Sequence, residues 1–279
     1  KRVLVVGDSW VWGWKQFDSD RLAVQLSTLL KKGLMAAGND SKAAEGYEFH
    51  TVAMPAWNVI SEHAFLESHY ARLQPDYVIW VMTQNDVIDI AGVIPPGVIA
   101  HSLSTQVHNH APFDEYSMTL YPMPFLRERW ETNIGLVNRF QAKYNIPVLG
   151  MFVHMSKGFV SYVTERVQPE FPVLMGSPLH KDKRWNVTPN DSHPSSWASR
   201  AMALAFLNEM SKSEFLPELQ WKAEDRQLID AWTMWQTTEK ATFKLGPYTD
   251  SWVKKTPWKY PQETGPEDEG SRTWIEDKG

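Results

Sequence analysis

The sequence contains no cysteine among its 279 residues. This absence excludes disulfide bonds, thiolate metal sites and cysteine nucleophiles. It leaves the compartment undecided, because cytosolic and exported proteins can both lack cysteine. A signal-like segment is also missing, as is any apolar run near the roughly 18 residues that a membrane span requires. We therefore expect a soluble protein without a membrane span, and its localisation stays unknown.

An excess of positive charge is absent as well. The 28 Lys and Arg residues are outnumbered by 33 Asp and Glu residues, which gives a net charge of −5 and no electrostatic footprint for nucleic acid. No G-x-G-x-x-G, Walker-type or G-x-S-x-G motif occurs, which argues against nucleotide binding and against the ordinary α/β-hydrolase architecture. His108 and His110 lack supporting ligands at suitable spacing. We therefore expect no metal and no cofactor.

What the sequence does contain is an alternation of short apolar runs with amphipathic segments. The runs are rich in β-branched and apolar residues, as in buried parallel strands, and lie at 3–6, 47–53, 76–83 and 146–155. Segments with helical spacing lie between and after them, at 18–37, 58–73, 125–144, 194–210 and 217–241. This alternation predicts an α/β protein, a three-layer α/β/α sandwich with a central parallel sheet.

Composition divides the chain into one large domain and a tail. The length suffices for a single α/β domain with a well-buried core, which we place at 1–244. Within it, regularity fades at about 91–124 and 156–190, which we interpret as irregular insertions. Over 245–279, proline, glycine, tryptophan and charge follow no period, so we expect an extended C-terminal tail.

The first apolar run ends abruptly in Gly7-Asp8-Ser9. In open α/β sheets, ligands bind at the carboxyl ends of the strands, and Ser9 would lie at that edge. We expect Gly7 to let the backbone turn sharply there. A serine in such a place can be a turn residue or a helix cap. It can also be a nucleophile, if the rest of the chain supplies its partners.

Polar residues from distant parts of the sequence would meet Ser9 at this edge. Asn85 follows the third run, and Asp191 and His193 follow the last one. A serine hydroxyl needs a base to take its proton, and His193 can serve. Asp191 lies two residues before it and would face the same side of an extended backbone, where it can orient the imidazole. The Asn85 amide and the backbone N–H groups of Ser9 and Ala56 are candidate oxyanion donors.

Each of these residues also has a purely structural interpretation. Asp191 could be a turn residue or a helix cap, His193 a surface histidine, and Asn85 a turn residue. Pro194 fits the first position of the next helix, which would leave His193 in the loop before it. Only the combination indicates catalysis, because every role that acyl transfer requires occurs once, at the same predicted edge.

The ordered set of blocks resembles the SGNH, or GDSL-type, hydrolase family. Gly7-Asp8-Ser9, with Gly13, is similar to its first block, and Asn85-Asp86 to its third. Asp191-Ser192-His193-Pro194 is similar to the fifth block, with one residue fewer between acid and base. The resemblance implies the flavodoxin-like SGNH fold, with Ser9 as nucleophile, His193 as base, Asp191 as its partner and Asn85 as an oxyanion donor.

The chain departs from the family's pattern at three places. Ala56 stands where the second block usually has a glycine, and Thr83 stands where a glycine often precedes the Asn-Asp pair. Trp10 replaces the usual leucine. Because the spacing of the fifth block is shorter here, Asp182 or a backbone carbonyl could orient the histidine in place of Asp191.

Tryptophan is unusually frequent, with 14 residues. Trp10, Trp12 and Trp57 lie close in sequence to the predicted site, and flat rings suit a sugar surface. We therefore predict a serine esterase that removes a small acyl group, acetyl in particular, from a carbohydrate or another small molecule. Lipase, thioesterase and acyltransferase activities use the same machinery. The alternative is a non-catalytic binding or structural module that kept the fold, and the oligomeric state stays open.

Overall fold

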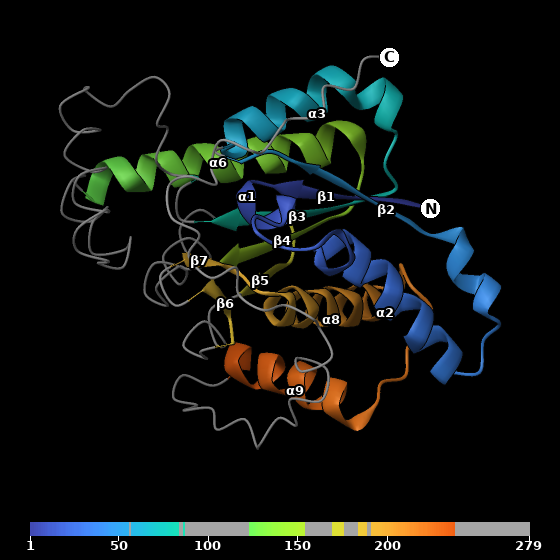
Figure 1. Cartoon of the computed structure of the whole chain (residues 1–279). Coiled ribbons are helices and arrows are strands. Elements are labelled where there is room, and N and C mark those ends of the chain that lie inside the picture. The colour runs from blue at the N-terminus through green and yellow to red at the C-terminus, as the bar shows by residue number, and fades with distance from the viewer. Residues whose placement is uncertain are drawn as a thin grey trace, which may run out of the picture. The chain divides into compact units, whose positions relative to one another are not determined.

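Five parallel strands form the centre of the fold (Figure 1). The computed structural model describes residues 1–55, 57–83, 86, 123–153, 169–175, 184–188 and 191–237. It describes the backbone alone at 123–129, 175, 188, 191–192 and 231–237. All these residues belong to the larger of two compact units of the chain, Lys1–Leu245. The predicted tail, Ala56 and Asn85 lie outside the described residues.

The sheet has the strand order β2-β1-β3-β4-β5. This order is that of flavodoxin-like folds. Register places Val6 of β1 beside Val52 of β2 and beside Trp80 of β3. The central strands are buried along almost their whole length, which explains their uninterrupted apolar runs. The strands are β1 (Arg2–Gly7), β2 (Glu48–Ala53), β3 (Tyr77–Thr83), β4 (Val148–Val153) and β5 (Val173–Met175).

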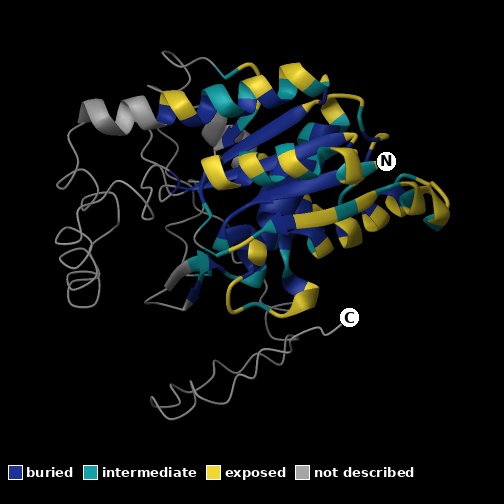
Figure 2. Ribbon diagram, turned by 90° about the horizontal axis from the view of Figure 1, so that it is seen from above, coloured by how far each residue is buried: buried dark blue, intermediate teal, exposed yellow. Residues whose placement is uncertain are grey.

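Helices cover both faces of the sheet, which confirms the predicted three-layer α/β/α architecture (Figure 1). One face carries α3 (Val59–Leu73) and α6 (Met123–Tyr144), and the other carries α2 (Leu22–Ala36) and α8 (Ser196–Lys212). A further helix, α9 (Ala223–Thr237), packs on α8. Figure 2 shows a buried centre, formed by β1, β3 and β4, with exposed residues on the outer sides of the helices. The edge strand β2 is largely exposed.

The helix ends follow local sequence signals. The side chain of Asn58 caps α3 by accepting a hydrogen bond of 2.9 Å from the Ser61 N–H. Gly38, just after α2, has a φ of 84°, which suits a residue without a Cβ. Short elements complete the first half of the chain: α1 (Ser9–Trp12) and the 3-10 turns η1 (Asp18–Asp20) and η2 (Ser41–Gly46).

The second half of the chain differs from expectation in its short strands. The stretch 156–190, expected to be irregular, contains β5 and β6 (Asn186–Thr188). β6 pairs antiparallel with β7 (Asp191–Pro194), so His193 lies in a strand and not in a loop. Pro194 ends that strand, and α8 begins after it, capped by Ser195. Strands of three or four residues are too short for alternation to reveal them.

The structure bears on two other expectations only in part. Of the insertion predicted at 91–124, only the first residues of α6 are described. The helix predicted from 217 begins later, at Ala223. Within the part of the chain that the structure covers, no helix combines the length and the apolarity needed to cross a bilayer.

Candidate active site

Ser9 is the first residue of α1, directly after β1. β1 lies between β2 and β3, and this is the point where the strand order reverses. Ligands of open α/β proteins bind in the crevice at such a point, beyond the carboxyl ends of the strands. Ser9 therefore occupies the position at which this topology favours a site.

The close packing of α1 explains the glycine at position 7. A Cβ on Gly7 would lie 2.5 Å from Val11 Cγ2 and 3.1 Å from the Val81 carbonyl oxygen. Gly7 does not have a positive φ, unlike Gly13 with its φ of 79° at the end of α1. The expected role of Gly7 as a flexible turn residue is therefore replaced by a steric one: only hydrogen fits between β1, β3 and the first turn of α1.

The structure brings Ser9 and His193 into contact across 184 residues of sequence. Ser9 Oγ lies 2.8 Å from His193 Nε2, and both side chains are partly exposed. With the ring proton on Nδ1, the hydroxyl donates to Nε2. This distance falls within the range in which a base can take the proton of an attacking oxygen. The structure thus brings the predicted pair within hydrogen-bond distance.

Two indole rings from the nucleophile's own segment flank the histidine. Ring centroids of Trp10 and Trp14 lie 6.2 and 6.1 Å from that of His193. Trp10 is only 6% exposed and also contacts the buried Trp185, with centroids 6.4 Å apart. Trp14 is 38% exposed. Trp10, which the sequence suggested as a substrate contact, is therefore a packing residue behind the histidine.

Side-chain hydrogen bonds join the segment after Ser9 to the start of α8, after His193. Gln16 Nε2 donates to the Pro194 carbonyl oxygen and, at 2.9 Å, to Ser199 Oγ. The Ser196 hydroxyl donates to the buried Asp20 carboxylate at 2.7 Å. These bonds fix the exit of β7, and with it the position of the histidine.

The remaining predicted site residues stay predictions. Asp191 lies in β7, two residues before His193, and the backbone alone is described there. Asn85, Ala56 and Asp182 lie outside the described residues.

The two other tryptophans predicted to bind substrate lie in different surroundings. Trp12 is 39% exposed, and the Arg21 guanidinium lies 5.3 Å from its ring centroid. Trp57 is partly buried and packs against the core beneath α3 and α6. Its ring centroid lies 5.2 Å from that of Phe65. Of the predicted set, Trp12 presents the larger free surface.

A group of buried carboxyl groups, which includes the residue before Ser9, was not predicted. Asp8, Glu62 and Asp86 are all 3% exposed or less. Burial, together with the charge of Asp8, raises the pKa of Glu62 to about 8, against the lowering effect of a 2.5 Å hydrogen bond from Trp80 Nε1. Burial raises the pKa of Asp86 well above its ordinary value, and the negative charges of Glu62 and Asp8 add to this effect.

A sequence signal for Glu62 does exist. The buried positions of α3 include Val59, Glu62 and Leu66, spaced three and four residues apart. That spacing places Glu62 on the apolar face of the helix, where a carboxyl group is unusual and requires a partner.

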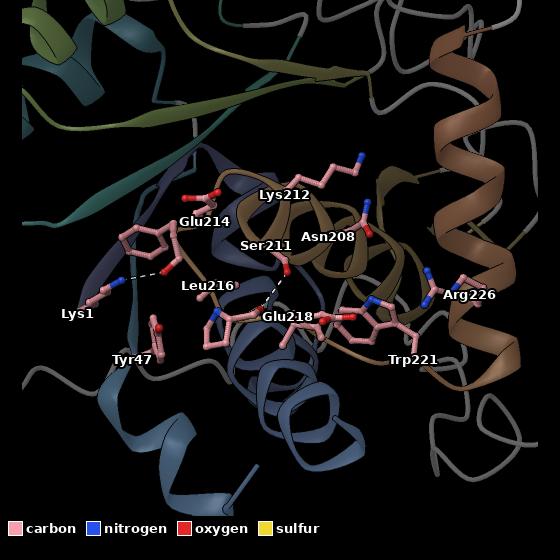
Figure 3. Close-up of a pocket in the computed structure, with 13 residues that line it drawn as sticks. Lys1, Tyr47, Asn208, Ser211, Lys212, Glu214, Leu216, Glu218, Trp221 and Arg226 are labelled. Carbon is pink, nitrogen blue, oxygen red and sulfur yellow. Dashed lines mark hydrogen bonds between the residues drawn. The ribbon is translucent and has the colours of Figure 1, made fainter. Parts of the chain in front are cut away.

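Figure 3 shows the residues around a pocket, whose volume is about 610 Å³ and whose lining does not include Ser9. Lys1, before β1, borders it, together with residues from the end of α8 and the loop leading to α9. Lys1 Nζ donates to the Phe215 carbonyl oxygen at 2.8 Å there. Because Ser9 follows the other end of β1, this pocket does not contain the Ser9–His193 pair.

Comparisons with known proteins give similarities of fold only. No protein-family profile matches the sequence, and no curated protein matches it. Similar solved structures include the psychrotrophic esterase EstA from Pseudoalteromonas sp., at 9% identity, covering 77% of this chain and 99% of that one, with a TM-score of 0.47. A GDSL-like lipase from Bacteroides thetaiotaomicron has 11% identity, 76% and 89% coverage, and a TM-score of 0.45. The acetyl xylan esterase AlAXEase has 14% identity, 75% and 99% coverage, and a TM-score of 0.47.

Proposed function

We propose that this chain is a serine hydrolase of SGNH type that acts on ester bonds. The observation that carries the proposal is the 2.8 Å contact between Ser9 Oγ and His193 Nε2 at the carboxyl edge of a parallel sheet. A serine hydroxyl is a weak nucleophile until a neighbouring base takes its proton. The Nε2 atom of His193 lies within hydrogen-bond distance of the Ser9 hydroxyl and can accept this proton.

The reaction would proceed in two halves. Ser9 Oγ attacks the ester carbonyl carbon while His193 Nε2 takes the hydroxyl proton. The imidazolium then gives this proton to the departing alkoxide, and the acyl group stays on Ser9. In the second half His193 takes a proton from water, the hydroxide attacks the acyl carbon, and the Ser9 oxygen leaves with the proton that His193 returns.

Stabilisation of the tetrahedral intermediate requires donors aimed at its oxygen. Ser9 is in the first turn of α1, where backbone N–H groups have no partner within the helix. We assign its N–H, the N–H of Ala56 and the amide of Asn85 to this role. Asp191, two residues before His193, is proposed to orient the ring, with Asp182 or a backbone carbonyl as its rival.

The preferred substrate is a small acyl ester, acetyl in particular, carried by a carbohydrate. The support is the exposed ring of Trp14 beside His193, together with the exposed ring of Trp12 in the same short segment, since flat aromatic surfaces suit sugar rings. Trp14 is favoured over the buried Trp10 as a substrate contact, because it borders His193 and still reaches solvent.

Ester hydrolysis by the wild-type chain and Ser9→Ala tests this proposal. We expect turnover of p-nitrophenyl acetate that exceeds turnover of the butyrate and octanoate esters, and release of acetate from an acetylated oligosaccharide. Ser9→Ala should lose at least about 10³-fold in kcat. Ser68→Ala, which removes an exposed hydroxyl on α3, should keep wild-type rates.

Other outcomes discriminate between the alternatives. Preference for octanoate would replace the carbohydrate-acetyl substrate with a lipid ester. A folded wild-type chain that hydrolyses none of these esters would favour the non-catalytic binding module.

A further inference from the structure

Thr83, the last residue of β3, lies between two buried aspartates, Asp8 and Asp86. Its hydroxyl is 3.1 Å from Asp8 Oδ2, and its backbone N–H donates to Asp86 Oδ2. All three residues are 3% exposed or less. One residue at the end of β3 therefore contacts both Asp8, which precedes Ser9, and Asp86.

The carboxylate of Asp8 links this contact to the nucleophile. Its Oδ1 accepts a 2.9 Å hydrogen bond from the Trp10 N–H, in the first turn of α1. Its Oδ2 is the atom that the Thr83 hydroxyl reaches. The two oxygens of the Asp8 carboxylate thus connect the start of α1 to the end of β3. Ser9 lies between Asp8 and Trp10, in the part of α1 that these hydrogen bonds hold.

Asp86 anchors the other side of Thr83. Its backbone carbonyl oxygen accepts a 3.0 Å hydrogen bond from Asn133 Nδ2 of α6. The Thr83 hydroxyl also interacts with the Asp86 carboxyl group. Asp86 is therefore held by α6 through its carbonyl oxygen and by Thr83 through its carboxyl group.

A hydroxyl in this place does more than fill space. The groups that face it are carboxyl groups, those of Asp8 and Asp86, with Glu62 near both. A buried carboxylate that loses a donor bears the full cost of its desolvation, and it relieves that cost by moving or by taking up a proton. Either change alters the cap of α1.

We propose that Thr83 is a positioning residue: its hydroxyl fixes the Asp8 carboxylate as the cap of α1 and so holds Ser9 Oγ within reach of His193. This inference rests on the proposed function. It also gives a reason for the threonine that stands where the resembled family often has glycine, since glycine has no hydroxyl to offer.

Thr83→Val and Thr83→Ser separate the hydroxyl from the shape of the side chain. Valine keeps the β-branch and removes the donor, so kcat for p-nitrophenyl acetate should fall about 10- to 100-fold, with KM within 2-fold of wild type. Serine keeps the donor and should restore kcat to within about 3-fold. Thr51→Val, the same change at an exposed position of β2, is the matched control and should leave kcat unchanged.

A readout independent of activity is the backbone N–H of Trp10, observed by amide hydrogen exchange. Its protection should decrease in Thr83→Val and stay at the wild-type level in Thr83→Ser. If Thr83→Val does not fold, Thr83→Ala replaces it with the same expectations.

The outcomes separate the two proposals. An active wild-type chain whose folded Thr83→Val variant keeps its kcat would overturn the positioning role alone. Loss of kcat that serine does not restore would overturn it as well, because the hydroxyl would then not be the cause. An inactive wild-type chain would overturn the proposed function and, with it, the catalytic meaning of Thr83.

Discussion

The two segments that supply Ser9 and His193 are built in opposite ways. Ser9 follows a six-residue buried strand that is flanked on both sides by other strands of a five-stranded parallel sheet. His193 belongs to a four-residue strand of a separate two-stranded antiparallel sheet. Ser9 is therefore placed by the core, whereas His193 is flanked by side chains from the segment that contains Ser9. The site should consequently be more easily disturbed on the histidine side.

The largest effect on activity is expected from His193→Ala. Removing the base should lower kcat by about 10³-fold or more, since the members of such a unit act together. Because the side chain is partly exposed, the melting temperature should stay close to that of the wild type. Ester turnover and thermal unfolding measure the two effects, with the exposed His50→Ala as control. Wild-type activity in His193→Ala would contradict the proposal that His193 is the base.

Gly7→Ala tests the core side of the comparison. The added methyl group would stand 2.5 Å from Val11 Cγ2, which requires α1 to shift. We expect a loss of about 1–3 kcal/mol in the free energy of unfolding, together with a lower kcat. Gly46→Ala is the matched control, because nothing lies within 4 Å of its added Cβ. Equal urea midpoints for the two variants would contradict the steric role of Gly7.

Gln16→Ala tests the histidine side. The substitution removes the hydrogen bonds to the Pro194 carbonyl oxygen and to Ser199 Oγ. We expect kcat to fall about 10-fold, which corresponds to about 1.4 kcal/mol, while the melting temperature changes little. Gln25→Ala, which loses a bond within one local segment, is the control and should keep its activity. A wild-type kcat in Gln16→Ala would mean that β6 and β7 hold His193 without this support.

Glu62→Gln concerns stability and carries the smallest expected effect on activity. In the folded chain the pKa of Glu62 is raised from 4.5 to about 8. Between pH 4.5 and pH 8 the carboxyl group is therefore protonated in the folded state and ionised in the unfolded state. Stability from the neutral carboxyl group is therefore present below about pH 4.5 and is lost as the pH rises towards 8.

The neutral glutamine keeps the acceptor for Trp80 and avoids this loss. Urea unfolding at pH 5 and pH 9 should show the free energy of unfolding of the variant rising relative to wild type by about 1 kcal/mol or more at the higher pH. A difference between the two proteins that does not change with pH would show that Glu62 is charged in the fold.

The sequence sufficed where structure is local and repetitive. Uninterrupted apolar runs revealed the buried strands β1, β3 and β4, and helical spacing revealed α2 and α3. The expected contact between Ser9 and His193 is present, because parallel strands bring their carboxyl ends to one edge and the chain returns there before α8.

What could not be predicted depends on how elements pair and pack. β5, β6 and β7 are too short to show a period: β5 forms by pairing with β4, and β6 and β7 form by pairing with each other. Trp10 looked like a substrate contact from its position in the sequence, but its burial depends on Trp185. The role of Thr83 appears only once β1 and β3 lie side by side.

The most direct test of the account is to locate the residue that a fluorophosphonate probe modifies, by peptide mass spectrometry. In the wild-type chain the adduct should lie on the peptide that contains Ser9, and Ser9→Ala should show none. In His193→Ala the adduct should form at least about 100-fold more slowly, because the base no longer takes the hydroxyl proton. An adduct on another serine, or labelling of Ser9 at an unchanged rate without His193, would contradict the claim that these two side chains form one catalytic unit.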